Sequence, residues 1–205
     1  MRRPELIARQ AGRPSGLLGR FLTRVMALET AAANRAAIAR LAPAPDARLL
    51  EVGCGHGRTV AALANAVPRG HVTGVDHSPA ALAVARHRCA ALLRVGRVRF
   101  DCADSAALPY GAATFDGALA VHTVYFWSPL ETHLAELRRV LAPGARLVLG
   151  FRRPSARTRA DLPASVYTLR EPAAIAASLR AAGFAAVDLE IVGDELVLAV
   201  ATGAV

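Results

Sequence analysis

The feature that most constrains the fold is the regular alternation of strand-like and helix-like segments between residues 48 and 183. Strands that alternate with helices along a chain pair in parallel, and the helices then cover both faces of the sheet. The sequence therefore predicts an α/β fold built on a mostly parallel sheet. The expected strands are 48–53, 71–76, 98–104, 115–124 and 145–151, and the expected helices are 58–67, 78–93, 129–141 and 171–183.

The end of the chain departs from this alternation. Two strand-like runs, 186–192 and 195–200, are separated only by Gly193 and Asp194, a pair that suits a two-residue hairpin turn. So short a turn leaves no room for a crossover helix. The last strand is therefore predicted to run antiparallel to its neighbours.

Composition narrows the class of protein. The 205 residues are enough for one domain with a full core and a small appendage. The net charge is +9, but all 25 basic residues are arginine, which we interpret mainly as a base-composition bias of the genome. The charge is therefore weak evidence for a nucleic-acid partner.

The cysteines and the apolar runs indicate a compartment. Cys54, Cys89 and Cys102 form no CxxC pair, which argues against a disulfide scaffold and against a zinc or other metal site. No apolar stretch approaches the roughly 18–20 residues of a membrane span. The first residues are basic without an apolar run behind them, so no secretion signal is expected. We expect a cytoplasmic protein with no membrane span.

A glycine-rich stretch, "LLEVGCGHGRT" at residues 49–59, follows the first strand. It is either an ordinary turn from strand to helix or a place where backbone approaches a nucleotide-type ligand closely. A dinucleotide fingerprint would need its third glycine at position 58, which is Arg58, and a phosphate-binding P-loop would need lysine. Glu51 beside the loop would repel phosphate and suits a cationic ligand.

Two aspartates at strand ends complete this pattern. Asp76 ends the second strand, 19 positions after Gly57, where an acid accepts hydrogen bonds from both hydroxyls of a ribose. Asp104, at the end of the third strand, could accept from the exocyclic amine of adenine. The sequence thus indicates a ligand with adenine, ribose and positive charge but no phosphate.

S-adenosylmethionine (SAM) is such a ligand, and here the chain resembles the class I SAM-dependent methyltransferases, closest to the methyltransferase type 11 and ubiquinone-biosynthesis-like group. The resemblance covers about residues 43–205 and rests on "LLEVGCGHG", "VTGVDHSPAAL", "VRFDCADSAALPYGAATFDGALA" and "ELRRVLAPGARLVL" in that order. It implies a Rossmann-like sheet of seven strands in the order 3-2-1-4-5-7-6, mostly parallel with an antiparallel last strand, and helices on both faces.

The resemblance also implies the cofactor contacts. The glycines meet the methionine part and the ribose, Asp76 takes the ribose hydroxyls, and the backbone of Ala120 receives the methionine amino group. His77 lies against adenine, although an apolar residue is usual there. The implied contacts are Glu51, Gly53, Gly55, Gly57, Asp76, His77, Asp104, Ser105 and Ala120.

The acceptor site is expected at "VHTVYFWSP", residues 121–129, after the fourth strand. His122 is a candidate general base, because imidazole titrates near pH 6.5. Tyr125 could position an acceptor, and Phe126 and Trp127 could wall the pocket. The alternative is that these residues only pack locally. The residues "AVHT" stand where enzymes that methylate adenine or cytosine amines carry an "NPPY"-type motif.

The N-terminal residues 1–42 are predicted to form a helical cap on a SAM-binding domain at 43–205. The basic amphipathic segment 17–28 could cover the pockets as a lid, touch an anionic membrane or nucleic acid, or pack on the sheet. We favour a lid that also packs, because a buried cofactor needs a cover.

Three functions remain open at this stage. The first is an enzyme that transfers a methyl group from SAM to a small-molecule acceptor, without a nucleic-acid partner. The second is a SAM-binding regulatory protein without turnover. The third, ranked low, is an RNA or protein methyltransferase. The sequence identifies neither the acceptor atom nor the oligomeric state, for which a homodimer is one arrangement.

Overall fold

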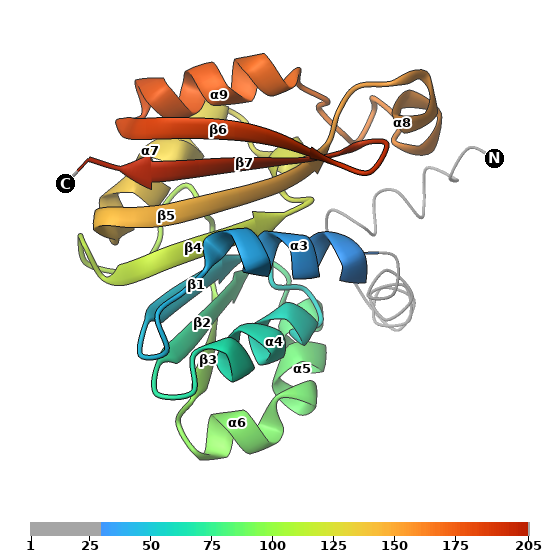
Figure 1. The fold of residues 1–205 in the computed structure, drawn as a ribbon. Helices are drawn as coiled ribbons and strands as arrows, with labels where there is room; N and C mark the ends of the chain where they lie inside the picture. The colour runs from blue at the N-terminus through green and yellow to red at the C-terminus, as the bar shows by residue number, and fades with distance from the viewer. Residues whose placement is uncertain (1–29, 205) are drawn as a thin grey trace.

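The computed structural model describes residues 30–204, and within them the chain forms one seven-stranded sheet (Figure 1). The strand order is β3-β2-β1-β4-β5-β7-β6, with β7 antiparallel to both β5 and β6 and the other neighbours parallel. This confirms the predicted fold class and strand order. The strands are β1 Arg48–Val52, β2 His71–Asp76, β3 Val98–Cys102, β4 Phe115–Val121, β5 Leu141–Arg152, β6 Phe184–Val192 and β7 Leu196–Gly203.

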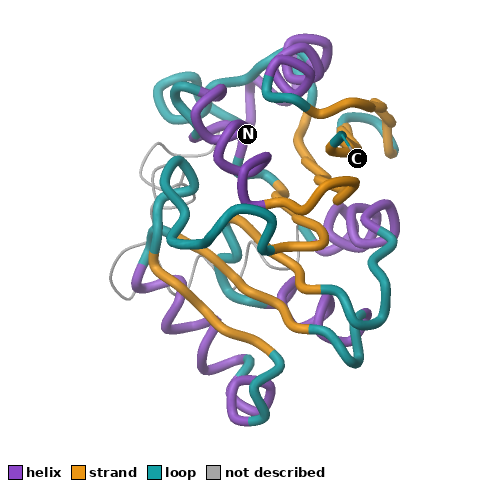
Figure 2. Tube along the Cα trace, turned by 90° about the vertical axis from the view of Figure 1, so that its left-hand side faces the viewer, coloured by secondary structure: helices purple, strands orange, loops and turns teal. Residues whose placement is uncertain are grey.

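Helices cover both faces of this sheet, as Figure 2 shows by the helical segments on either side of the strands. Alternate residues of a strand point to opposite faces. Leu49 therefore packs under α3 and α4, whereas Leu50 belongs to the core under α7 and α9. The described helices are α3 Ala31–Leu41, α4 Arg58–Ala66, α5 Pro79–Arg88, α6 Ala90–Arg94, 3₁₀ helix η1 Val124–Phe126, α7 Leu130–Val140, α8 Ala156–Asp161 and α9 Pro172–Ala181.

The N-terminal cap is seen only in part. The basic segment 17–28 lies outside the described residues. Within α3, Ala37 and Leu41 are buried against the sheet, so this end of the predicted cap is one of the helices that cover the sheet face. None of the helices formed by residues 30–204 is long and apolar enough to cross a membrane.

Several element ends differ from the prediction. The expected helix 78–93 is interrupted at Cys89, where the backbone leaves helical geometry and α6 begins. The fourth strand ends at Val121 because His122 adopts a positive φ of 60°. The short helices α8 and η1 were not predicted, since segments of 6 and 3 residues carry too little periodicity.

The fold decides where a ligand site can lie. The strands β1, β2 and β4 are parallel neighbours, so their carboxyl ends reach the same edge of the sheet. In open α/β sheets, ligands bind in the crevice beyond these ends.

Candidate functional site

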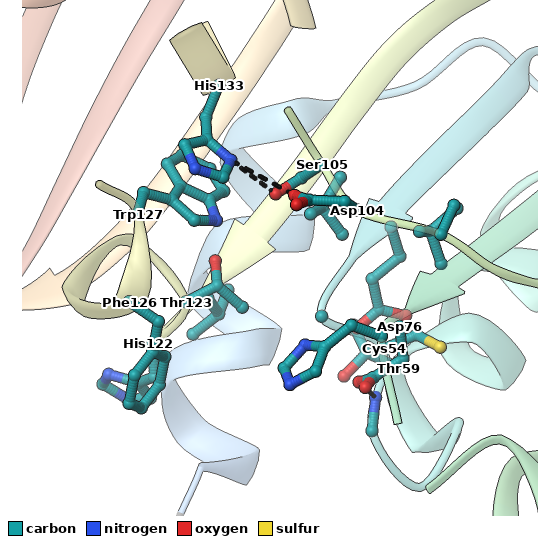
Figure 3. Close-up of a pocket in the computed structure, with 18 of the residues that line it drawn as sticks. Cys54, Thr59, Asp76, Asp104, Ser105, His122, Thr123, Phe126, Trp127 and His133 are labelled. Atoms are coloured by element: carbon teal, nitrogen blue, oxygen red, sulfur yellow. Dashed lines mark hydrogen bonds and ion pairs between the residues drawn. The ribbon is translucent and has the colours of Figure 1, made fainter. Parts of the chain in front are cut away.

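A cavity of about 490 Å³ lies beyond the carboxyl ends of β1, β2 and β4 (Figure 3). It brings together most of the site residues predicted from the sequence. Those among its lining are Glu51, Gly53, Gly55, Asp76, His77, Asp104, Ser105 and His122. Three predicted residues, Gly57, Ala120 and Tyr125, are not among the described residues that line it.

The glycines of the loop have different tasks. A Cβ atom on Gly53 would lie 2.0 Å from Cγ2 of Thr123, and one on Gly57 would lie 2.9 Å from Cβ of Ala85. At Gly55 the space is open, with a φ of 50°. Gly55 therefore presents bare backbone to a ligand. Gly57 permits close packing between α4 and α5, and its contact with a cofactor stays a prediction.

Asp76 connects the end of β2 to the glycine loop. Its Oδ2 accepts the N–H of Gly55 at 2.9 Å, and its Oδ1 accepts the N–H of Ser78 at 2.9 Å. Asp76 thus holds the local backbone on both sides of its own strand end. Because a carboxylate offers about four lone-pair sites, both oxygens can still accept ribose hydroxyls.

Glu51 is a buried acid with unused hydrogen-bonding capacity. The residue is 6% exposed, and its Oε2 has no partner in the described part of the chain. Burial raises the pKa of Glu51 well above its ordinary value, against a hydrogen bond with Thr59 that lowers it. A buried carboxylate with one unpartnered oxygen is costly, and a cationic ligand in the cavity would offset that cost.

This cost predicts an effect of Glu51→Gln on the ligand-free protein. Since the folded pKa is raised above the ordinary 4.5, stability is lost as the pH rises from the unfolded pKa through the folded one. The substitution is expected to raise the free energy of unfolding by about 1–3 kcal/mol near pH 8 and by less near pH 5. Urea unfolding at the two pH values measures this.

Glu136→Gln is the matched control. Arg139 lowers the pKa of Glu136 by a hydrogen bond, so neutralising that carboxyl should cost stability at pH 8. A Glu51→Gln protein that is less stable than the parent at pH 8, or shows the same gain at both pH values, would contradict the account of Glu51.

The side of the cavity that is predicted to receive adenine is formed by His77 and by residues of the β3–β4 loop, residues 103–114. His77 is exposed, and the side chain of Asp104 is 71% exposed while its Oδ1 accepts the N–H of Ala106 at 2.9 Å. Ser105, by contrast, is buried, and its Oγ is hydrogen-bonded to Nδ1 of His133 at 2.8 Å. Asp104 is thus the more accessible partner for a ligand, and Ser105 is held by the protein.

The side of the cavity that is predicted to receive the acceptor begins at His122, directly after β4. Its positive φ is uncommon for a residue other than glycine, and such strain concentrates at functional sites. Its N–H donates to the carbonyl of Gly150 at 2.7 Å. Val121 and His122 line the cavity, whereas Ala120 is buried within β4. The contact through the backbone of Ala120 stays a prediction.

Tyr125 lies behind His122 rather than in the cavity. It is 4% exposed, and its hydroxyl is 3.1 Å from Nδ1 of His122 and accepts the N–H of Arg152 at 2.6 Å. Tyr125 is thus a direct partner of the His122 ring. The predicted direct contact of Tyr125 with an acceptor is not supported, because core packing hides the ring.

This contact bears on the tautomer of the His122 ring. The Tyr125 oxygen accepts from the N–H of Arg152, and its O–H is within hydrogen-bond distance of Nδ1 of His122. Burial raises the pKa of Tyr125, which keeps that proton in place. When the phenol donates to Nδ1, a neutral His122 carries its own proton on Nε2. Such a ring donates a hydrogen bond at Nε2, and action as a base there requires the other tautomer.

Sequence reasoning missed several polar residues of the cavity, four of which are notable. His56 is buried, its Nδ1 accepts the N–H of Arg58 at 3.1 Å, and burial with nearby arginines lowers its pKa to about 4. His133 of α7 had no motif to mark it. Thr30 and Asn34 come from the start of α3, far away in sequence.

A comparison with protein families matches residues 49–144 to a methyltransferase domain. Among curated proteins, the chain is similar to the O-methyltransferase cnsE of Penicillium expansum, 40% identical over 110 residues, which cover 54% of this chain and 40% of that protein. The chain spans between 40% and 48% of the length of the first three curated relatives that it matches.

Solved structures with a similar fold also include a methyltransferase. One similar structure is a 1,6-didemethyltoxoflavin-N1-methyltransferase of Burkholderia thailandensis with bound 1,6-didemethyltoxoflavin and S-adenosylhomocysteine (SAH). It is 26% identical, with a TM-score of 0.66 over 85% of this chain and 79% of that one. Another is the [4+2]-cyclase SpnF, 22% identical, with a TM-score of 0.75 over 85% and 81%.

Proposed function

We propose that the protein transfers a methyl group from SAM to a small-molecule acceptor, because residues 49–144 match a methyltransferase domain and the fold is similar to that of a methyltransferase with bound SAH. The observation that carries this proposal is the buried, unpartnered Oε2 of Glu51 beside the glycine loop and Asp76. SAM combines a cationic methionine end with a ribose, which suits these two carboxylates. A pyrophosphate in the same place would meet two negative charges.

The residues of the cavity would hold and orient the reactants. Glu51 attracts the positively charged methionine end, Asp76 accepts the ribose hydroxyls, and Asp104 accepts from the adenine amine. When bound, SAM supplies a methyl group that is already activated by its sulfonium. The contribution of the protein is then to align the acceptor in line with the transferred methyl and to exclude water.

On the acceptor side, we propose that His122 orients the acceptor and that Tyr125 sets its tautomer. With Nε2 as a donor, His122 suits an acceptor oxygen or another atom that arrives with a lone pair exposed. Phe126 and Trp127 supply flat apolar walls beside it. The names of the curated relatives favour oxygen as the methylated atom.

A second candidate is a SAM-binding protein that transfers no methyl group. We retain this candidate because a protein named as a [4+2]-cyclase has a similar fold. The intact set of Glu51, Asp76 and Asp104 supports cofactor binding equally in both cases, so only the product separates them.

Mass spectrometry of the purified protein and of its reactions tests the proposal. We expect SAM or SAH to co-purify, and an incubation with metabolite pools and methyl-labelled SAM to yield labelled small molecules. Bound SAM without any labelled product across the pools would favour the second candidate. Neither bound SAM nor product would contradict both.

We further propose that residues 1–42 act as a cap on the cavity. The support is that Thr30 and Asn34, at the start of α3, line it. Deleting residues 1–28 is expected to leave a folded domain, because the sheet and α3 are built from later residues. It should weaken SAM retention or abolish transfer, as equilibrium dialysis and activity would show. A truncated protein that retains SAM and transfers the methyl group as the parent does would contradict the role of this segment as a lid.

The remaining assignments are also proposals. We propose that the protein is cytoplasmic. The support is that Cys54, Cys89 and Cys102 are free thiols, as is usual in a reducing compartment. We expect no nucleic-acid partner. A homodimer finds modest support in Leu189 and Ile191, large apolar residues exposed on the edge strand β6.

A further inference from the structure

His133 occupies a junction between the two halves of the cavity. It lies on α7, is 7% exposed, and lines the cavity from the side opposite the glycine loop. Its Nδ1 is hydrogen-bonded to Ser105 Oγ at 2.8 Å and lies 4.0 Å from Oδ1 of Asp104. Figure 3 shows both contacts as dashed lines. One edge of the ring thus contacts the β3–β4 loop, where we place adenine.

The face of the same ring meets the acceptor side. The imidazole is stacked on the indole of Trp127, with ring centroids 5.3 Å apart and planes inclined by 8°. Trp127 is 4% exposed and belongs to the turn after β4, residues 122–129. Arg170 fixes the backbone of this turn by donating to the carbonyls of Val124 at 2.8 Å and Trp127 at 2.6 Å. The position of the indole ring is therefore set by the turn and by His133.

Other α7 side chains also anchor the β3–β4 loop, but away from the cavity. Glu136 accepts the N–H of Leu108 at 2.7 Å, and Arg139 donates to the carbonyl of Tyr110 at 2.8 Å. His133, Glu136 and Arg139 follow at intervals of three, so they share one side of the helix. Among these three, His133 alone lines the cavity and contacts the Trp127 wall.

We propose that His133 is a positioning residue that fixes the β3–β4 loop and the Trp127 wall relative to each other, so that cofactor binding and acceptor binding are coupled. The coupling to a cofactor rests on the proposed function. A loop that closes on adenine moves Ser105, and the hydrogen bond passes this movement to the imidazole and to the indole stacked on it. His133 itself contacts no reacting atom in this proposal.

Two substitutions separate the two contacts of His133. His133→Phe keeps a flat ring against Trp127 and removes the hydrogen bond to Ser105. It is expected to weaken SAH binding about 2- to 10-fold, the usual effect of losing one hydrogen bond. His133→Asn keeps an amide near the position of Nδ1 and removes the stacked ring. It is expected to leave SAH binding nearly unchanged and to raise the KM for the acceptor about 2- to 10-fold.

Trp127 gives a second readout that needs no acceptor. It is the single tryptophan of the chain, so its fluorescence reports on this stack alone. A protonated imidazole quenches a stacked indole, whereas a neutral one does so weakly. Burial lowers the pKa of His133, Asp104 raises it and Arg170 lowers it further. The emission of the parent protein is therefore expected to fall as the pH drops, with a midpoint below 6.5.

The decisive experiment combines calorimetric titration with SAH, acceptor kinetics and the pH dependence of Trp127 emission for the parent and three variants. We expect the emission step to vanish in His133→Phe and His133→Asn. Glu136→Ala, the control, should lower the melting temperature and keep the step. An emission step that survives both His133 variants, or equal loss of SAH and acceptor binding in both, would overturn the role of His133.

This design also separates the inference from the proposed function. If the parent protein binds no SAH by calorimetry, the proposed function fails, whatever the emission shows. If SAH binds tightly to the parent and equally tightly to His133→Phe, the proposed function stands and the coupling through His133 fails.

Discussion

Replacing Asp76 with alanine is expected to weaken SAH binding by at least about 100-fold, because two charge-assisted hydrogen bonds to ribose are each worth about 1.5–3 kcal/mol. The structure adds a second loss. Without Oδ2, the N–H of Gly55 has no acceptor from β2, and the loop that carries the bare backbone loses its anchor. Calorimetric titration of the purified variant with SAH measures the combined effect.

Two further variants make this result interpretable. Asp76→Asn retains one oxygen for a backbone N–H and removes the charge, so its affinity should fall between the parent and Asp76→Ala. Asp116→Ala removes a carboxylate at the amino end of β4, where it binds Arg48 far from the cavity, and should leave SAH affinity unchanged. An Asp76→Ala protein that remains folded and binds SAH as the parent does would show that ribose is held elsewhere.

Removing the His122 side chain is expected to lower kcat roughly 10- to 100-fold, as fits the loss of one hydrogen bond to a charged or strongly polar atom. General-base catalysis would instead predict a loss of ~10²–10⁴ and a rate that falls at low pH with the protonation of imidazole. If His122 acts as a hydrogen-bond donor, protonation of its ring at low pH keeps the hydrogen on Nε2 and does not by itself lower the rate. The acid side of the pH profile should then follow the ionisation of the acceptor.

Tyr125→Phe distinguishes the two roles more sharply. Without the phenol, Nδ1 of His122 loses its donor, and the tautomer with a free lone pair on Nε2 becomes accessible. A donor role predicts a lower kcat in Tyr125→Phe, whereas a base role predicts an unchanged or higher one. The variant also leaves the N–H of Arg152 without its acceptor, so its melting temperature is measured alongside. A His122→Ala enzyme with unaltered kcat would contradict both roles of His122 and leave alignment of the reactants to the other residues of the cavity.

The fold was largely predictable because its determinants are local. Alternating apolar runs and turn residues fixed the bounds of β2 and the start of β1, β3 and β4, and the Gly193-Asp194 turn made the last strand antiparallel. The strand order came from the resemblance to the class I methyltransferases, since periodicity does not say which strands are neighbours. Helix bounds were less accurate where a helix was interrupted, as at Cys89.

The site was predictable only where a residue is tied to the end of a strand. The cavity lies at the carboxyl ends of β1, β2 and β4. A residue at or next to one of these ends reaches it, as Glu51, Asp76 and His122 do. The pairing of His133 with Ser105 joins residues 28 positions apart through tertiary packing, and the pattern around His133 is that of any amphipathic helix. The separate task of Gly57 depends on Ala85 of a different helix, which no local spacing reveals.

The central claim is that the cavity is built for adenosine attached to a cationic group rather than for a dinucleotide. Titration calorimetry of the full chain with SAH, SAM, NAD and ATP tests it most directly. The account predicts saturable binding of SAH and SAM at one site per chain and no heat of binding with NAD or ATP. Saturable binding of NAD together with no binding of SAH or SAM would contradict it.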